Sequence, residues 1–458
     1  MSEWTTSKLS DVIEIIGGGT PKRSETSYWN GNIPWLSVGD FNNDFRFVSN
    51  TSEKISKLGL QNSSTKLLKA GQLILSARGT VGCLAQLSIP MAFNQSCYGL
   101  NGKENIIDNG FLYYFLKNNI NELKQKTHGS VFDTITRNTF EQINISYPNI
   151  KTQQVIARTL GFFDNKITLN TQTNQTLEQI AQAIFKHWFI DFAPVHAKAN
   201  ALARGETIEQ AELAAMACLS GKTAEKITAL KTEDPTAYHQ LQQTAAAFPS
   251  EFVETEMGQV PKGWEYKRAE DLFKIGIGKT PPRKESQWFS SNSKNNVEWI
   301  SIKDMGNSGT HILESSEYLT QEAIKNFNIK KIPENTVLLS FKLTIGRVSI
   351  TTKETTTNEA IAHFKIGKSH LSTEFLYCYL KNFDFEQLGS TSSIATAVNS
   401  KTIKNMNILF PDIEVVNAFQ KKISILFEKI KSNTKEISYL TSIRDELLPK
   451  LLNGEIEL

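Results

Sequence analysis

The stretch GQLILSARGTVG at residues 71–82 has a counterpart, NTVLLSFKLTIG, at residues 335–346. Both stretches place a short apolar run before a turn that carries a cation, a threonine and a final glycine. Short apolar runs bounded by glycine- and asparagine-rich turns are typical of β-strands. The pair therefore predicts a strand–turn unit that occurs twice in the chain.

Five further blocks recur in the same order around this pair, at an offset of roughly 260 residues. They are GGGTPKR (17–23) with GIGKTPPRK (276–284), IPWLSVGD (33–40) with VEWISIKD (297–304), FNQS (93–96) with TNEA (357–360), FLYYFLK (111–117) with FLYCYLK (375–381), and INISYPNI (143–150) with MNILFPDI (406–413). Chance similarity would not keep this order, so the sequence predicts a duplicated unit. The alternative, two unrelated α/β domains, leaves the order unexplained.

The hydrophobic period changes after Pro148 and again after Pro411. Apolar or asparagine residues then follow a four–three spacing, which is the heptad pattern of a coiled-coil seam. The seam residues are Ile156, Leu160, Phe163, Ile167, Asn170, Asn174, Leu177 and Ile184 in the first copy, and Phe419, Ile423, Leu426, Ile430, Asn433, Ile437, Leu440 and Leu447 in the second. The alternative is that each helix is amphipathic and lies on its own domain.

A seam that is apolar along one stripe needs a partner, and the nearest partner is the other copy. A duplicated chain that closes on itself about a pseudo-two-fold axis makes the two helices antiparallel, which brings Asn174 near Asn433. The predicted fold class is α+β, with two similar α/β domains joined by two long antiparallel helices that form a coiled coil and act as a rigid spacer. The predicted divisions are a first domain (1–150), a helix (151–192), an Ala-rich helical connector (193–262), a second domain (263–411) and a C-terminal helix (412–458).

Composition narrows the class of protein. Hydrophobic residues make up 40% of the chain, charged residues 21%, and the formal net charge is +3. The four cysteines lie far apart without a C-x-x-C pair, which favours a reducing cytoplasm over a disulfide framework. No signal peptide and no apolar stretch long enough to span a membrane is expected.

The sequence lacks the signatures of common catalytic sites. It has no Asn/Asp-Pro-Pro-aromatic motif for a flipped base, and GIGKT (276–280) lacks the first glycine of a phosphate-binding P-loop. The histidines show no metal-ligand spacing, and no Ser/His/Asp group stands out. We therefore expect no catalytic residue, metal site or cofactor in this chain, although a self-contained DNA methyltransferase or a coiled-coil scaffold remains an alternative.

The matched blocks carry turn residues of types that contact DNA. Cations and hydroxyls in a Gly/Pro-shaped loop suit phosphates, Arg or Lys on a turn can reach guanine, and Asn or Gln can pair with adenine. The predicted DNA-binding residues are Thr20, Lys22, Arg23, Arg78, Thr80, Asn94, Gln95 and Ser130 in the first copy, and Thr280, Arg283, Lys284, Lys342, Thr344, Asn358, Glu359 and Ser390 in the second. For each of them taken alone, a solvated or capping role is the alternative.

The two copies differ at the tips of these turns. Arg78-Gly79 becomes Lys342-Leu343, and Gln95-Ser96 becomes Glu359-Ala360. Similar domains with different tips are expected to read two different half-sites.

Four stretches of the chain are similar to those of a known family: KTQQVIARTLGFFDNKITLN (151–170), NQTLEQIAQAIFKHWFIDF (174–192), FPSEFVETEMGQVPKGW (248–264) and LLPKLLNGEIEL (447–458). Through them the chain resembles the specificity subunits of type I restriction-modification systems. The resemblance implies two target-recognition domains on two antiparallel helices, and a double-stranded DNA target in two parts separated by an unspecific gap.

The resemblance also implies partners. It implies assembly with two methyltransferase subunits and two ATP-dependent restriction subunits, which would bind the S-adenosylmethionine, ATP and Mg²⁺. The helices would dock the methyltransferases, with Phe185, Trp188 and Phe189 as candidate contacts, although core packing is an alternative for them. Arg444 departs from the apolar seam and puts one layer of the coiled coil in doubt.

Overall fold

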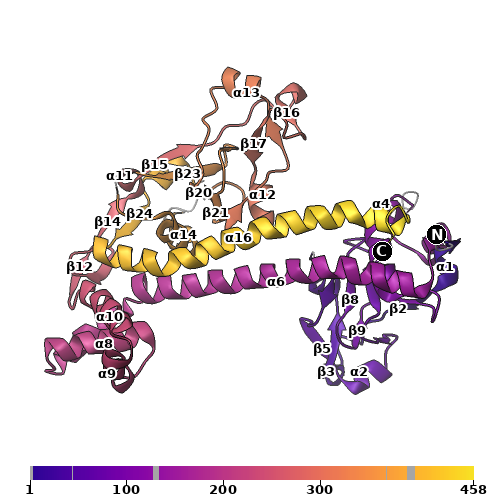
Figure 1. Cartoon of the computed structure of the whole chain (residues 1–458), viewed down its shortest axis with the longest axis horizontal. Helices are drawn as coiled ribbons and strands as arrows, with labels where there is room; N and C mark the ends of the chain where they lie inside the picture. Colours follow the sequence, from indigo (N-terminus) through magenta and orange to yellow (C-terminus); the bar gives the residue numbers. More distant parts are fainter. Residues whose placement is uncertain (1–3, 44, 127–133, 368, 389–397, 458) are drawn as a thin grey trace. The chain divides into compact units, whose positions relative to one another are not determined.

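The computed structural model describes residues 4–43, 45–126, 134–367, 369–388 and 398–457, which belong to two compact units. Unit 1 comprises residues 1–170 and 436–458, and unit 2 comprises residues 171–435. Two long helices, α6 (Ile150–Phe189) and α16 (Ile413–Leu452), are shared between the units, with one end of each helix in either unit (Figure 1).

Unit 1 is built on a five-stranded sheet whose strands pair antiparallel, except for the parallel edge strand β4. In order across the sheet, the strands are β2 (Ile13–Gly17), β10 (Cys97–Gly102), β7 (Leu73–Ser76), β8 (Leu84–Leu87) and β4 (Phe47–Val48). A four-stranded sheet contains β5 (Glu53–Ile55), β3 (Trp29–Leu36), β9 (Met91–Phe93) and β6 (Leu67–Leu68), and a separate pair joins β1 (Thr5–Lys8) to β11 (Asn144–Tyr147). The shorter helices are α1 (Leu9–Val12), α2 (Lys57–Gln61), α3 (Asn109–Asn118), α4 (Ile120–Gln125) and α5 (Arg137–Glu141).

Unit 2 repeats the five-stranded sheet with the same order and the same strand directions. The strands are β15 (Phe273–Ile277), β23 (Ile361–Ile366), β20 (Val337–Ser340), β21 (Val348–Thr351) and β18 (His311–Ile312). Its four-stranded sheet contains β16 (Phe289–Ser290), β19 (Tyr318–Leu319), β17 (Val297–Ile300) and β22 (Thr356–Thr357), and the remaining strand pairs are β14 (Glu265–Arg268) with β24 (Asn407–Phe410) and β12 (Phe252–Thr255) with β13 (Gly258–Pro261). The helices are α11 (Ala269–Leu272), α12 (Ile302–Asn307), α13 (Gln321–Asn326), α14 (Thr373–Asn382) and α15 (Ser400–Lys404).

The central strands β7 and β20 are buried at every position, which explains why both read as unbroken apolar runs that end in serine. A strand covered on both faces has no solvent side, so its sequence does not alternate. Each strand leads into one of the turns that the sequence marks as candidate DNA contacts, so the sheet provides a rigid base for those turns.

The two long helices run antiparallel in each unit. In unit 2, the Asn433 side-chain amide donates to Asn174 Oδ1 at 2.9 Å, as antiparallel pairing predicts. In unit 1, Asn170 donates to Glu436 at 2.9 Å. The pairing continues in the same antiparallel register, because Asp164, nearer the start of α6, pairs with Arg444, nearer the end of α16. All sixteen predicted seam residues are buried or half-buried.

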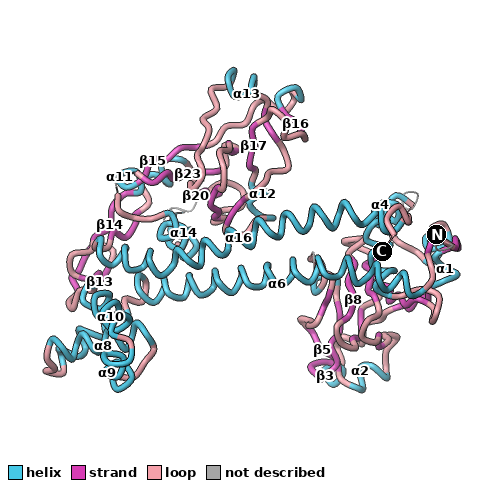
Figure 2. The backbone as a smooth tube through the Cα atoms, in the orientation of Figure 1, coloured by secondary structure: helices cyan, strands magenta, loops and turns pink. Residues whose placement is uncertain are grey.

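Residues 193–247 form four helices that pack in unit 2: α7 (Ala193–Ala203), α8 (Ile208–Ser220), α9 (Ala224–Glu233) and α10 (Pro235–Ala247) (Figure 2). Their buried residues, among them Val195, Met216 and Ile227, belong to the same hydrophobic core as α14 and the α16 residue Phe419. The segment that the sequence presents as a connector is therefore part of the unit 2 core.

The predicted fold class, α+β with two similar domains and two long antiparallel helices, is confirmed. Among the helices of the described residues, none combines the length and the hydropathy that a membrane span requires.

Candidate nucleic-acid interface

In each unit, a glycine-rich loop after the first strand of the main sheet lies against the turn that carries Asn94 or Asn358. In unit 1, the Gly19 N–H donates to the Phe93 carbonyl at 3.0 Å, and in unit 2 the Lys279 N–H donates to the Thr357 carbonyl at 2.9 Å. A Cβ added at Gly18 or Gly278 would overlap the carbonyl oxygen of the asparagine. Only glycine allows this close approach, which explains the glycines in both copies.

A buried tryptophan donates a hydrogen bond to the backbone of each glycine-rich loop. Trp35 Nε1 donates to the Gly19 carbonyl, and Trp299 Nε1 donates to the Lys279 carbonyl, both at 3.1 Å. Both side chains are almost completely buried. The sequence reasoning missed these tryptophans as loop anchors, although they occupy the same place in the repeated blocks IPWLSVGD and VEWISIKD.

Arg23 and Arg283 each pair with a carboxylate and lie over aromatic rings, and about half of each side chain stays exposed. Arg23 makes a two-point pair with Glu53 and lies 3.9 Å from the ring centroid of Trp29. Arg283 pairs with Glu317 at 2.8 and 2.9 Å. The bond to the carboxylate raises the pKa of each guanidinium. The paired carboxylate offsets the positive charge, so both arginines brace the loops, and a phosphate contact would compete with that pairing.

A threonine in each glycine-rich loop bonds the variable residue of the neighbouring turn. The Thr20 hydroxyl donates to the Gln95 side chain, and the Thr280 hydroxyl donates to the Glu359 carboxylate. The bond joins the same two loops in both units, but it presents a neutral amide in unit 1 and an anion in unit 2. An exposed amide and a carboxylate select different base edges.

Asn94 and Asn358 shape their turns with the side-chain oxygen. Asn94 Oδ1 accepts from the Ser96 N–H, and Asn358 Oδ1 accepts from the Ala360 N–H, both at 3.0 Å. This is the hydrogen bond of an Asx turn, which orients the chain locally. Two-point pairing with adenine would use that same oxygen as an acceptor, and contact of these two residues with DNA stays a prediction.

The strand–turn units 76–82 and 340–346 adopt the same turn. The Ser76 hydroxyl donates to the Thr80 carbonyl and the Ser340 hydroxyl donates to the Thr344 carbonyl, both at 2.6 Å. The N–H groups of Gly82 and Gly346 donate back to the two serine carbonyls at 3.0 Å. These bonds leave the tips exposed, with Arg78 and Thr80 in unit 1 and Lys342 and Thr344 in unit 2.

Each unit thus brings three loops to one surface. The Ala77 N–H donates to the Ser96 carbonyl at 2.8 Å, and the Phe341 N–H donates to the Ala360 carbonyl at 3.0 Å, which fixes the strand–turn unit beside the asparagine turn. Loop surface 1 is defined by Thr20, Lys22, Arg78, Thr80 and Gln95, and loop surface 2 by Thr280, Lys284, Lys342, Thr344 and Glu359. The predicted residues Ser130 and Ser390 lie outside the described residues.

Comparison with known proteins decides the family. The family model described as type I restriction modification DNA specificity domain matches residues 1–179 and 261–442. The chain is 35% identical to the HindI specificity subunit of Haemophilus influenzae, with both chains covered completely, and 27% identical to the MjaIX specificity subunit of Methanocaldococcus jannaschii, with 99% and 94% covered. The chain belongs to the family of type I restriction-modification specificity subunits.

A solved structure shares the fold. The S subunit of a type I restriction-modification system from M. genitalium superposes with a TM-score of 0.55 at 15% identity, covering 98% of this chain and 96% of the other. At that identity, the likeness shows the fold alone. The family prediction and its central assignment, a subunit that gives DNA sequence specificity, are confirmed.

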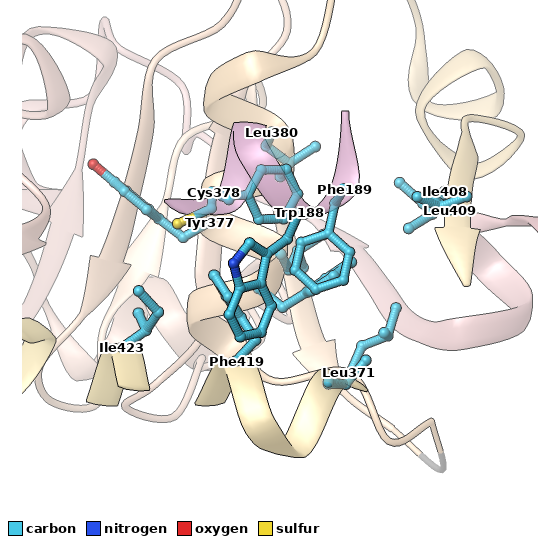
Figure 3. Close-up of a cluster of buried hydrophobic side chains, with 14 of the residues drawn as sticks. Trp188, Phe189, Leu371, Tyr377, Cys378, Leu380, Ile408, Leu409, Phe419 and Ile423 are labelled. Carbon is cyan, nitrogen blue, oxygen red and sulfur yellow. The ribbon is translucent and has the colours of Figure 1, made fainter. Parts of the chain in front are cut away.

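The aromatic residues predicted to dock a methyltransferase pack inside this specificity subunit instead. Phe185, Trp188 and Phe189 are all nearly inaccessible to solvent, and Phe189 lies 5.1 Å from Phe419 between ring centroids (Figure 3). Trp188 also packs on Phe248 at 5.2 Å. Side chains buried in the unit 2 core present no surface to a partner, so the core-packing alternative is the correct one for all three.

Arg444, which departs from the apolar seam, is matched by a buried carboxylate. Its guanidinium lies 2.6 Å from Asp164, and Asp164 also accepts from the Tyr114 hydroxyl at 2.6 Å. Arg46 donates to Tyr114 at 3.2 Å and occupies the space that a side chain at Gly161 would fill. The layer of the coiled coil that contains Arg444 is therefore polar. Its acidic partner, Asp164, could be identified only from the antiparallel register of the two helices.

Within the described residues, no cluster of three or more His, Cys, Asp or Glu side chains is placed to hold a metal ion. The exposed side chains of both loop surfaces offer hydrogen bonds and positive charge. That combination suits recognition of phosphates and base edges.

Proposed function

We propose that this specificity subunit reads a DNA target in two parts, with loop surface 1 on one half-site and loop surface 2 on the other. The observation that carries the proposal is the repetition of the loop framework without repetition of the tips. The hydrogen bonds that hold the loops recur in both units, whereas Arg78 is exchanged for Lys342 and Gln95 for Glu359. A constant framework with changed tips is what two different sequence readers need.

Exchange of residues 1–150 for those of another family member tests this proposal. The chimera is produced with its methyltransferase partner, and the methylated sequence is read by methylome sequencing. We expect one half-site to change and the other half-site and the gap to stay as in the wild type. A change in both half-sites would contradict the division of labour between the two loop surfaces.

The two shared helices are proposed to set the length of the gap between the half-sites. Seven residues inserted at matched places in α6 and α16 add about 10 Å of helix, or about 3 base pairs of DNA. We expect the methylated target to gain a gap of about that size. A seven-residue insertion in the turn after Lys222, between α8 and α9, is the control and leaves the gap unchanged.

The chain is also proposed to catalyse no reaction and to bind no cofactor itself. In this proposal, S-adenosylmethionine, ATP and Mg²⁺ bind to methyltransferase and restriction subunits, and the assembly works on DNA in the cytoplasm. The purified chain should transfer no methyl group from radiolabelled S-adenosylmethionine to its target, and addition of the methyltransferase should start the transfer. Methyl transfer by the chain alone would overturn this part.

Exposed apolar residues on the long helices support two equivalent sites for methyltransferase subunits. Phe162 on α6 and Ile425 on α16 are 67% and 72% exposed, and they occupy the same place in the two copies of the heptad pattern. One exposed apolar side chain is ordinary on a protein surface, but its recurrence at the same place in both copies supports a contact with another protein. Because the place is occupied once in each unit, we propose one methyltransferase on each.

Native mass spectrometry of the reconstituted complex tests the docking sites. Phe162→Glu and Ile425→Glu should each reduce the complex from two methyltransferases to one, and the double variant should bind none. Leu58→Glu changes an apolar residue on α2 that is 52% exposed, and this control should leave two bound. Retention of both subunits by the double variant would exclude these positions.

A further inference from the structure

Leu343, at the tip of the unit 2 turn, is in an unfavourable place for a leucine. Its side chain is 97% exposed, more than any other large hydrophobic side chain in the described part of the chain. Its backbone has φ +63°, in the left-handed region, where a residue with a branched side chain is strained. Exposure and backbone strain both lower stability, and a side chain that is 97% exposed gains little from packing within the subunit to offset them.

The turn itself does not require leucine. Unit 1 has Gly79 at this position with φ +74°, and it forms the same turn with the same serine hydrogen bonds. The described residues contain seven non-glycine residues with positive φ, and five of them are asparagine, which tolerates this conformation. The sixth, Phe192, packs against other aromatic rings. Leu343 alone combines the conformation with full exposure of an apolar side chain.

Hydrogen bonds fix the backbone of the turn that carries this side chain. The Ser340 hydroxyl accepts from the Arg347 N–H at 3.0 Å while it donates to the Thr344 carbonyl, so both ends of the turn are tied to one residue. Phe341, just before the tip, is almost completely buried. Leu343 therefore projects from a braced turn, between the exposed polar residues Lys342 and Thr344 of loop surface 2.

We infer that Leu343 is a specificity-determining residue that makes an apolar contact with the C5-methyl group of a thymine in the half-site read by unit 2. The inference rests on the proposed function. The thymine methyl is the apolar feature of the major groove, and small apolar side chains recognise it directly. The flanking lysine and threonine can bind phosphates or base edges beside it. In unit 1, Gly79 offers no such contact and lets the backbone approach the DNA closely.

The test uses the complex of this subunit with its methyltransferase and a duplex that carries its methylated target. Leu343→Asn keeps a residue suited to positive φ, so the variant should melt at the same or a higher temperature than the wild type. We expect it to bind the target about 10-fold more weakly, with unchanged affinity for a duplex of unrelated sequence. Val253→Asn, an exposed apolar residue on strand β12, is the matched control and should bind as the wild type does.

Replacement of each thymine in the unit 2 half-site by uracil removes one methyl group at a time. One such replacement should weaken wild-type binding about 4-fold, the effect of burying a single methyl group, and should not weaken binding by Leu343→Asn further. Equal binding of the target by wild type and Leu343→Asn, or additive losses, would overturn the inference alone. If the wild-type complex does not distinguish its target from targets altered in one half-site, the proposed function fails instead.

Discussion

Units 1 and 2 share a framework, but one buried layer between the two long helices has different residue types in each unit. In unit 1, this layer is the buried ion pair of Asp164 and Arg444. In unit 2, the same two places in the repeat hold Phe427 and Ala181, both buried and apolar. One position in a duplicated core can therefore be filled by an ion pair or by an apolar pair, provided that both members change together.

The carboxylate that bonds the sheet domain also differs between the units. Tyr114 donates to Asp164 in unit 1, whereas Tyr377 donates to Glu178 in unit 2, both at 2.6 Å. Two matched lysines approach these carboxylates, Lys117 at 3.7 Å from Asp164 and Lys381 at 3.5 Å from Glu178. Both units thus attach the sheet domain through a tyrosine, a lysine and a carboxylate of α6. The repeat preserves the type of attachment and not the individual residues.

The largest expected effect comes from breaking the buried ion pair. Asp164→Ala removes the buried carboxylate partner of Arg444 and the acceptor of Tyr114, and leaves Arg444 with only the exposed carboxylate of Asp445. The loss should destabilise unit 1 by about 3–5 kcal/mol. Hydrogen exchange of α3 and of the α6 residues 150–170 measures the loss separately from unit 2. The double variant Asp164→Phe, Arg444→Ala copies the unit 2 layer and should recover most of the stability. No recovery would mean that the two layers are not interchangeable.

Acid should affect unit 2 through two buried histidines. Burial lowers the pKa of His311 and of His363 to about 4, with a further contribution from nearby lysines. A folded pKa below the unfolded value of about 6.5 means that stability is complete above pH 6.5 and is lost as the pH falls towards 4. Each histidine should account for up to about 3 kcal/mol of that loss.

His363→Gln removes one of these titrations, because glutamine does not ionise. Its unit 2 should lose up to about 3 kcal/mol less than the wild type between pH 6.5 and 4, as followed by hydrogen exchange of strands β20 and β23. Unit 1 serves as the internal control, since both buried histidines belong to unit 2. An unchanged acid response in the variant would show that folding does not lower the pKa of His363.

Truncation of the two tip cations compares the loop surfaces directly. Arg78→Ala should weaken binding of the target by about 1–3 kcal/mol if Arg78 reads a base, with relaxed preference at one position of the unit 1 half-site only. Lys342→Ala should act in the same way on the unit 2 half-site. Binding to duplexes with each half-site altered in turn separates the two effects. A uniform loss across all sequences would identify the residue as a phosphate contact.

The smallest effect is expected at the ion pairs that hold the arginines of the glycine-rich loops. Glu53→Gln and Glu317→Gln break ion pairs that are partly exposed, with Arg23 and Arg283. Exposed ion pairs contribute about 0–1 kcal/mol, so thermal unfolding should change little in either variant. If the freed arginine then reaches DNA phosphates, the affinity for DNA should rise, and its salt dependence should steepen. A fall in affinity would indicate that the brace holds the loop in its binding conformation.

Much of the candidate site could be predicted because the duplication acts as an internal control. Thr20 with Gln95 and Thr280 with Glu359 were selected as separate contacts, and the structure joins each pair by a hydrogen bond. The intramolecular partners of Arg23 and Asn94, which are Glu53 and the Ser96 N–H, could not be predicted, because only the folded loops bring them together. Phe185, Trp188 and Phe189 were assigned to a partner surface for a similar reason: an aromatic stripe on a helix looks the same whether it faces a core or another subunit.

The amino-acid sequence by itself determined that the chain is a duplication, that its two long helices pair through one stripe, and to which family it belongs. These follow from order and period, which are local properties of a chain. The tertiary structure alone decided that Arg444 is neutralised by Asp164, that Trp35 and Trp299 anchor the loops, and that Leu343 stands exposed at a strained tip. Such facts depend on which distant side chains share a small volume, because burial and hydrogen bonding act over a few ångströms of space and not along the sequence.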